Sequence, residues 1–177
     1  MSLLSNWENK KSKIQTAKEW SDMIINHQIG YDNKNCWQCR DYKKSLSTAP
    51  TLEDIDGMTP LKTMIKADMN NYTSWGWDDS YIGYMQCYVH CTSNQSLSCQ
   101  FYTDDAGRLY LNDVSRATSE SCKWTDVVLN FKKGWNKIQI LFQEGSGGDG
   151  AALNTKLSTQ TFIDAMYANI HDDTTSI

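Results

Sequence analysis

A chain of 177 residues has the size of one ordinary domain with room for an appended segment. Its mean hydropathy is −0.60 and no apolar run reaches the length of a membrane span, which excludes a membrane-inserted protein. The net charge of −4, with Lys and Arg scattered rather than clustered, argues against nucleic acid as a partner.

The first part of the chain predicts a helix and then a polar connection. Residues 4–29 lack Pro and Gly, and their apolar residues recur at helical spacing, which predicts an amphipathic helix within an N-terminal segment, 1–30. The apolar stripe lacks sustained heptads, so a coiled coil is not supported. Residues 31–67 are polar and predict an irregular connection, with room for one strand and an acidic turn at 51–57, packed on the domain that follows.

Short and evenly spaced strands predict a mainly β fold over residues 68–157. Alternating apolar residues between turn signals are typical of an antiparallel β-sandwich of the jelly-roll kind. The last run has one apolar face, made of Ile138, Ile140 and Phe142. The predicted strands are 81–91, 96–103, 108–112, 124–131 and 135–143, and the stretch 113–121 is interpreted as a polar connection.

The end of the chain predicts a second helix. Apolar residues between Leu157 and Ile170 follow i, i+3 and i+4 steps, and Ser158 is a possible cap. Residues 158–177 are therefore expected to form a C-terminal helix and a tail, so that helices flank the sandwich on both sides.

Six cysteines are compatible with a metal site or with structural thiols. Cys36 and Cys39 form a CxxC motif, which fits a disulfide or half of a zinc site but lacks the βαβ context of a redox motif. Cys87 and Cys91 fall on one face of an alternating strand, and Cys99 lies on the apolar face of the next, as buried thiols do. We expect structural thiols or strand-to-strand disulfides rather than zinc.

Two adjacent carboxylates, Asp104 and Asp105, follow a strand-like run and precede the turn residues Ala106 and Gly107. Their mutual repulsion costs stability unless a cation or strong hydrogen-bond donors offset it, and calcium prefers such oxygen ligands. The alternative is a turn without an ion, in which both carboxylates accept hydrogen bonds from backbone amides and Arg108 supplies the positive charge.

The order of motifs between Trp75 and Leu157 resembles a known family. A strand ending in TDD-x-G is followed by LYLN, by V-x-L-x-x-x-G-W-N-x-I-x-I and by a glycine-dense loop, Gly145–Gly150. This succession resembles the protective-antigen-type lectin β-sandwich, in the version found in tail-associated proteins of bacteriophages. The resemblance implies that paired Asp residues, joined by a cis peptide bond, hold a calcium ion that contacts sugar hydroxyls.

Carried over to this sequence, the resemblance assigns the metal to Asp104 and Asp105. Asp149 lies in the loop that would face them, and Gly147 and Gly148 of that loop are expected beside the ligand. The resemblance also implies a location in a phage tail or a prophage-encoded virion, with a homotrimer formed through the parent tail protein. The N-terminus shows no signal peptide, and we expect the chain to be a piece of a longer tail protein.

A second candidate surface lies in the aromatic stretch Ser74–Tyr84. Sugar rings stack on aromatic faces, while carboxylates bond their hydroxyls. The alternative is that these aromatic side chains lie in the core or cover the sheet edge. The residues proposed for ligand binding here are Trp75, Trp77, Asp78, Asp79 and Tyr81.

The sequence argues against an enzyme. It contains no GxSxG, HExxH, P-loop or GxGxxG motif, and two adjacent acids in one turn do not straddle a substrate as glycoside hydrolysis requires. We therefore expect a carbohydrate-binding module of a phage tail or cell-surface protein that recognises a host surface glycan. A structural or oligomerisation module of the tail that binds no ligand is the second hypothesis, and a glycan-directed hydrolase is the last.

Overall fold

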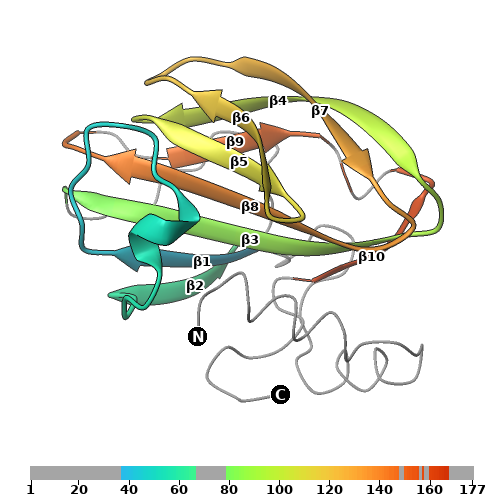
Figure 1. Cartoon of the computed structure of the whole chain (residues 1–177), viewed down its shortest axis with the longest axis horizontal. Helices are drawn as coiled ribbons and strands as arrows, with labels where there is room; N and C mark the ends of the chain where they lie inside the picture. The colour runs from blue at the N-terminus through green and yellow to red at the C-terminus, as the bar shows by residue number, and fades with distance from the viewer. Residues whose placement is uncertain (1–36, 67–78, 148–149, 156, 158–159, 168–177) are drawn as a thin grey trace.

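The computed structural model describes residues 37–66, 79–147, 150–155, 157 and 160–167, and these form an antiparallel sandwich of two sheets (Figure 1). The elements are β1 (Trp37–Tyr42), the 3-10 helix η1 (Leu52–Ile55), β2 (Lys62–Lys66), β3 (Tyr81–Cys91), β4 (Gln95–Asp104), β5 (Gly107–Leu111), β6 (Val114–Ser119), β7 (Thr125–Phe131), β8 (Gly134–Glu144), β9 (Gly150–Asn154) and β10 (Ile163–Tyr167). The larger sheet has the order β2-β1-β3-β8-β5-β6, with β10 paired to β3, and the smaller has the order β7-β4-β9.

The mainly β, antiparallel class is confirmed, as are the five predicted strands. They correspond to β3, β4, β5, β7 and β8, whose ends lie within one residue of the predicted ones. The turn before β8 also has the expected chemistry, because Gly134 has φ +90, a conformation that glycine adopts without steric cost. Alternation of apolar residues therefore located the strands of the central part of the chain.

The predicted C-terminal helix is wrong over the residues that the structure describes. Residues 163–167 form β10, which pairs antiparallel with the second half of β3, beyond the residues that β1 occupies on the same edge. An open strand edge offers backbone hydrogen bonds that a short isolated helix cannot match, since short helices are marginal without packing. The predicted N-terminal helix, 4–29, lies outside the described residues.

The polar stretches also carry more regular structure than predicted. The connection 113–121 contains β6, an edge strand of the larger sheet whose mostly exposed polar residues hide its strand character. The segment 31–67 contributes β1, β2 and η1 rather than an irregular connection with one strand. Within the described ranges, no helix is both long and apolar enough to cross a membrane.

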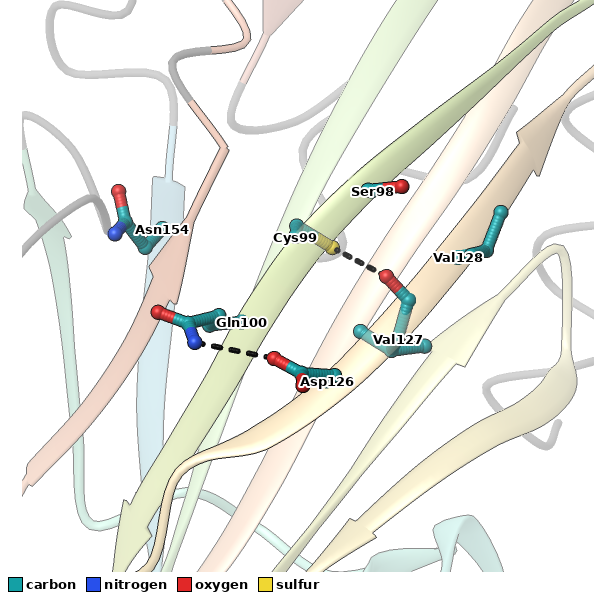
Figure 2. Close-up of a pocket in the computed structure, with 7 residues that line it drawn as sticks. All are labelled: Ser98, Cys99, Gln100, Asp126, Val127, Val128 and Asn154. Carbon is teal, nitrogen blue, oxygen red and sulfur yellow. Dashed lines mark hydrogen bonds between the residues drawn. The ribbon is translucent and has the colours of Figure 1, made fainter.

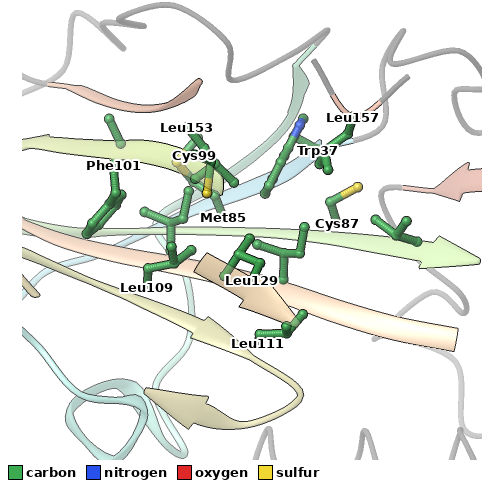
Figure 3. Close-up of a cluster of buried hydrophobic side chains, with 14 of the residues drawn as sticks. Trp37, Met85, Cys87, Cys99, Phe101, Leu109, Leu111, Leu129, Leu153 and Leu157 are labelled. Atoms are coloured by element: carbon green, nitrogen blue, oxygen red, sulfur yellow. The ribbon is translucent and has the colours of Figure 1, made fainter. Parts of the chain in front are cut away.

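The main core lies between the two sheets (Figure 3). Ile138, Ile140 and Phe142 are fully buried in it, which confirms the predicted apolar face of β8. The predicted burial of Cys87, Cys91 and Cys99 is also confirmed, at 0%, 0% and 6% exposure. These three, Cys39 and Cys122 are free thiols, so the disulfide alternative does not apply to them, whereas Cys36 lies outside the described residues.

A second apolar cluster covers the outer face of the larger sheet. Leu52 and Ile55 of η1 pack there with Tyr42, Tyr84 and Leu141 from the strands beneath. Both faces of β3 and β8 are consequently buried, and their burial patterns show almost no alternation. The candidate site lies at one end of these two buried strands, where β3 begins and β8 ends.

Candidate functional site

The paired carboxylates lie at the rim of the sandwich, where the chain leaves the smaller sheet for the larger one. Asp104 ends β4 and pairs with Gly150 at the start of β9. Asp105 belongs to the crossing to β5: its amide donates to the Gln143 carbonyl at 2.8 Å, and the Gln143 amide donates to the Ala106 carbonyl at 2.9 Å. The pair is therefore anchored to the ends of strands from both sheets.

Hydrogen bonds fix the orientation of the Asp105 carboxylate. Its Oδ1 accepts from the Ser121 hydroxyl at 2.9 Å, and its Oδ2 accepts from the Gly145 amide at 3.0 Å. The peptide bond between Asp104 and Asp105 is cis, as the resemblance implied. Arg108, the counter-charge in the alternative without an ion, instead donates from Nε to the Pro50 carbonyl at 3.2 Å.

A third carboxylate joins the pair. One carboxylate oxygen from each of Asp104, Asp105 and Glu144 lies within 4.8 Å of the other two. Glu144 ends β8 and is 1% exposed, whereas the two Asp residues are half-buried. Three carboxylates at this separation repel one another strongly unless a cation or a proton offsets the charge.

The start of the glycine-dense loop closes one side of the site. The Ser80 amide donates to the Gly145 carbonyl at 3.1 Å, and the Gly147 amide donates to Oδ1 of Asp79 at 3.4 Å. Two residues predicted for ligand binding, Asp79 and Gly147, are thus brought to the rim beside Asp105. This neighbourhood joins segments that the sequence analysis treated as two separate candidates.

The remaining predicted site residues fall into two groups. Trp75, Trp77, Asp78, Gly148 and Asp149 lie outside the described residues. Tyr81 is 2% exposed, and its ring packs edge-on against Phe142 with 5.9 Å between ring centroids. The structure therefore places Tyr81 in the core, which corresponds to the alternative given for this aromatic stretch.

The sequence predicted that the loop beginning at Gly145 lies beside the Asp pair, but it did not point to Glu144 or Ser121. Glu144 directly follows the predicted strand 135–143, but it was not recognised as a companion of the Asp pair. Its position follows from the ladders, since β5 begins at Gly107, which pairs with Phe142 two residues before Glu144. An acid at the end of the predicted neighbouring strand was the available signal, whereas Ser121 lies in a turn whose path the sequence does not reveal.

No protein-family model matches this chain, and no curated protein sequence does. Among solved structures, the β-glucosidase of Kluyveromyces marxianus aligns over 78% of this chain and 17% of its own, with 13% identity and a TM-score of 0.50. The epithelial adhesin 9 A domain of Candida glabrata, in complex with Galβ1-3GlcNAc, aligns over 77% and 91%, with 6% identity and a TM-score of 0.49. An anti-sigma factor domain-containing protein from Clostridium clariflavum aligns over 73% and 45%, with 11% identity and a TM-score of 0.49.

The chain spans about a sixth of the length of the β-glucosidase chain that it matches. At 13% identity this likeness shows a shared fold and nothing about the site. The chain is thus an antiparallel β-sandwich domain with a cluster of three carboxylates at its rim.

Proposed function

We propose that this chain is a carbohydrate-binding module whose rim site holds a calcium ion. The observation that carries the proposal is the convergence of Asp104, Asp105 and Glu144 within 4.8 Å, at the position where the resemblance implies a calcium-holding Asp pair. Calcium binds six to eight oxygen ligands, often carboxylates and backbone carbonyls. The donor set is entirely oxygen, so its chemistry fits this ion.

The chain's own groups prepare the site for a cation. Ser121 and Gly145 each occupy one lone pair of the Asp105 carboxylate and leave others for a metal, since each carboxylate oxygen can accept more than one bond. One oxygen of the Asp104 carboxylate lies within 4.8 Å of an oxygen of Asp105 and an oxygen of Glu144, so the three groups can face the same ion. The burial of Glu144 weakens solvent screening of its charge, and this strengthens its attraction for a cation.

A bound calcium ion would supply a Lewis-acidic centre for sugar hydroxyls, as the resemblance implies. The neighbouring Asp79 and the glycine loop would add acceptors and amides around the same hydroxyls. Hydroxyl recognition of this kind selects a sugar by the directions of its oxygen atoms. The ligand class that we propose is therefore a glycan, with a host surface glycan as the biological target.

Calorimetric titration with calcium tests the metal site. Wild type should bind one ion per chain, and the Asp104→Asn/Asp105→Asn variant should lose most of the heat. Asp126→Asn, which alters an exposed Asp on β7, is the matched control and should bind calcium as wild type does. Equal heats for wild type and the double variant would leave the pair as a structural turn.

A glycan array probed with and without a chelator tests the ligand. We expect binding to at least one glycan that is lost on chelation and in the double Asp variant. Failure to bind any glycan, with calcium binding intact, would favour the structural tail module over the lectin. An assay for release of reducing sugar from bound glycans should be negative, because we propose no enzymatic activity.

The wider context of the proposal rests on the resemblance alone. We place the chain in the tail of a phage or in a prophage-encoded virion, as part of a parent protein that forms a homotrimer. Size-exclusion chromatography with light scattering measures the assembly directly. A monomer for this chain would require that other parts of the parent protein form the trimer.

A further inference from the structure

The outer face of the smaller sheet has features that the rim site does not use. Side chains on one face of a strand alternate with those on the other, so Ser98, Gln100, Tyr102 and Asp104 of β4 share the solvent-facing side. Their inward neighbours, Cys99, Phe101 and Thr103, are buried. The carboxylate of the proposed calcium site is therefore the last member of a row that runs along this face.

A pair of aromatic side chains, half-buried Tyr102 and exposed Trp124, lies next to Asp104 on this face. Trp124 precedes β7 by one residue and is 45% exposed, and its ring lies 5.2 Å from that of Tyr102, centroid to centroid. Exposing a large indole to water is unfavourable, and such aromatic surfaces commonly mark a binding function. The two rings are tilted by 40° to one another, and each ring offers an apolar face of the kind on which the C–H groups of sugars stack.

Polar side chains from all three strands of the smaller sheet lie farther along this face (Figure 2). Asn154 and Asp126 both pair with Gln100 from the neighbouring strands, and the Gln100 amide donates to Asp126 at 3.0 Å. Gln100, Asp126 and Asn154 line a shallow pocket of about 480 Å³ together with Ser98 and Val128. The Val128 side chain is 52% exposed. Amides, a carboxylate and a hydroxyl beside exposed apolar surface match the mixed hydroxyl and C–H character of a sugar.

The charge of this face selects among saccharides. The facing residues of the three strands include Asp126 and Asp104 but no Lys or Arg. A polyanionic glycan would be repelled by these carboxylates, whereas a neutral one would not. From Ser98 to Asp104 the row spans six residue-to-residue steps, or roughly 20 Å at the rise of a β-strand, which is enough for several sugar rings.

We propose that this face, made of Tyr102, Trp124, Gln100, Asp126 and Asn154, is an extended subsite for a neutral oligosaccharide or polysaccharide chain. The inference takes its ligand class from the proposed function, and it adds a calcium-independent surface that lengthens the rim site. Trp124 and Tyr102 stack on the sugar rings, and the polar row bonds their hydroxyls. Asp104, at the end of the row, connects this subsite to the proposed calcium.

Native gel electrophoresis through soluble polysaccharides tests the proposal. The probes are neutral xyloglucan, galactomannan, mixed-linkage β-glucan, arabinan and glycogen, with hyaluronate as a polyanion. Wild type should be retarded by at least one neutral polysaccharide, and retardation should persist in EDTA. Trp124→Ala should weaken that binding about tenfold, as expected when a stacked aromatic side chain is removed.

The controls separate this subsite from the rim. Val114→Ser removes an equally exposed apolar side chain from β6 in the other sheet, and its retardation should match wild type. Asp104→Asn/Asp105→Asn should lose the calcium heat but keep retardation that depends on Trp124. Trp124→Ala should bind calcium normally, so the two sites can fail separately.

Three outcomes would overturn the proposal. They are no retardation of wild type by any neutral polysaccharide in the panel, retardation by hyaluronate alone, and equal retardation of wild type and Trp124→Ala. Circular dichroism of each variant establishes that the sandwich is intact. Tyr102→Ala provides a second truncation on the same surface, and it should also weaken binding without changing the calcium heat.

Discussion

The Asp105 carboxylate accepts a hydrogen bond from the backbone amide of Gly145, 40 residues away, at 3.0 Å. A β-carbon added at Gly145 would lie 3.1 Å from Oδ2 of Asp105. The glycine therefore lets the backbone come close enough to bond the carboxylate. This contact connects the glycine-dense loop after β8 to the Asp pair after β4.

Gly145→Ala should loosen the calcium site with little effect on folding. The new methyl group must displace the Asp105 carboxylate by a few tenths of an ångström, so we expect calcium affinity to fall several-fold. Stability should change by less than about 1 kcal/mol, because alanine also reduces the entropy of the unfolded chain. Calorimetry and thermal melts in EDTA measure the two effects, and unchanged calcium affinity would contradict this account of the glycine.

Glu144→Gln should have opposite effects with and without calcium. Without the ion, removing one of three neighbouring negative charges relieves repulsion, so the melting temperature in EDTA should not fall below wild type. With calcium, the variant should gain less thermal stabilisation, because the stabilisation by a bound ligand increases with the logarithm of its affinity. Melting curves in EDTA and in millimolar calcium give both values. A variant that gains as much as wild type would remove Glu144 from the site.

Much of the fold could be predicted from the sequence because alternation reports burial on one face. The inward residues of β7 follow that rule, and this strand was located to within a residue. Val114, on β6, shows where it fails: an edge strand with a 50% exposed apolar residue and polar neighbours resembles a loop. The helical spacing before Ile170 failed for another reason, since the open edge of β3 decides the structure there.

The site was predictable only in its local part. Asp104 and Asp105 are adjacent, so their repulsion is evident in the sequence, but Glu144 joins them through the closure of the sandwich. Tyr81 was expected at a binding surface and lies in the core. Its strand, β3, is buried on one face by the main core and on the other by the second apolar cluster, which includes η1. Alternation along β3 therefore carries no information about exposure.

Asp113→Asn should destabilise the protein by roughly 2 kcal/mol, somewhat less than the cost of breaking a fully buried ion pair. The Asp113 carboxylate lies 2.8 Å from the Lys137 ammonium, and the two side chains are 18% and 2% exposed. The variant leaves the buried ammonium without this counter-charge. Asn is suited to position 113, where φ is +68, so backbone strain does not confuse the result.

Urea unfolding measures the effect of Asp113→Asn. Glu120→Gln is the control, because Glu120 is 84% exposed and lies 4.0 Å from Lys123 at the surface. It should shift stability by less than about 0.5 kcal/mol. Equal, small effects of the two variants would mean that the buried pair contributes no more than a surface pair.

The described thiols should differ sharply in reactivity. Burial raises the pKa of Cys99 to about 12, so at pH 8 almost none of the reactive thiolate is present, and its side chain is also shielded from reagent. Cys39, Cys87 and Cys91 are at most 1% exposed, whereas Cys122 is exposed. Iodoacetamide at pH 8 should therefore modify Cys122 in the native protein, and the other four only after unfolding in guanidinium. Peptide mapping by mass spectrometry identifies each site, with Cys122→Ser as the control. Native modification of Cys99 at the rate of Cys122 would contradict the closed core between the two sheets.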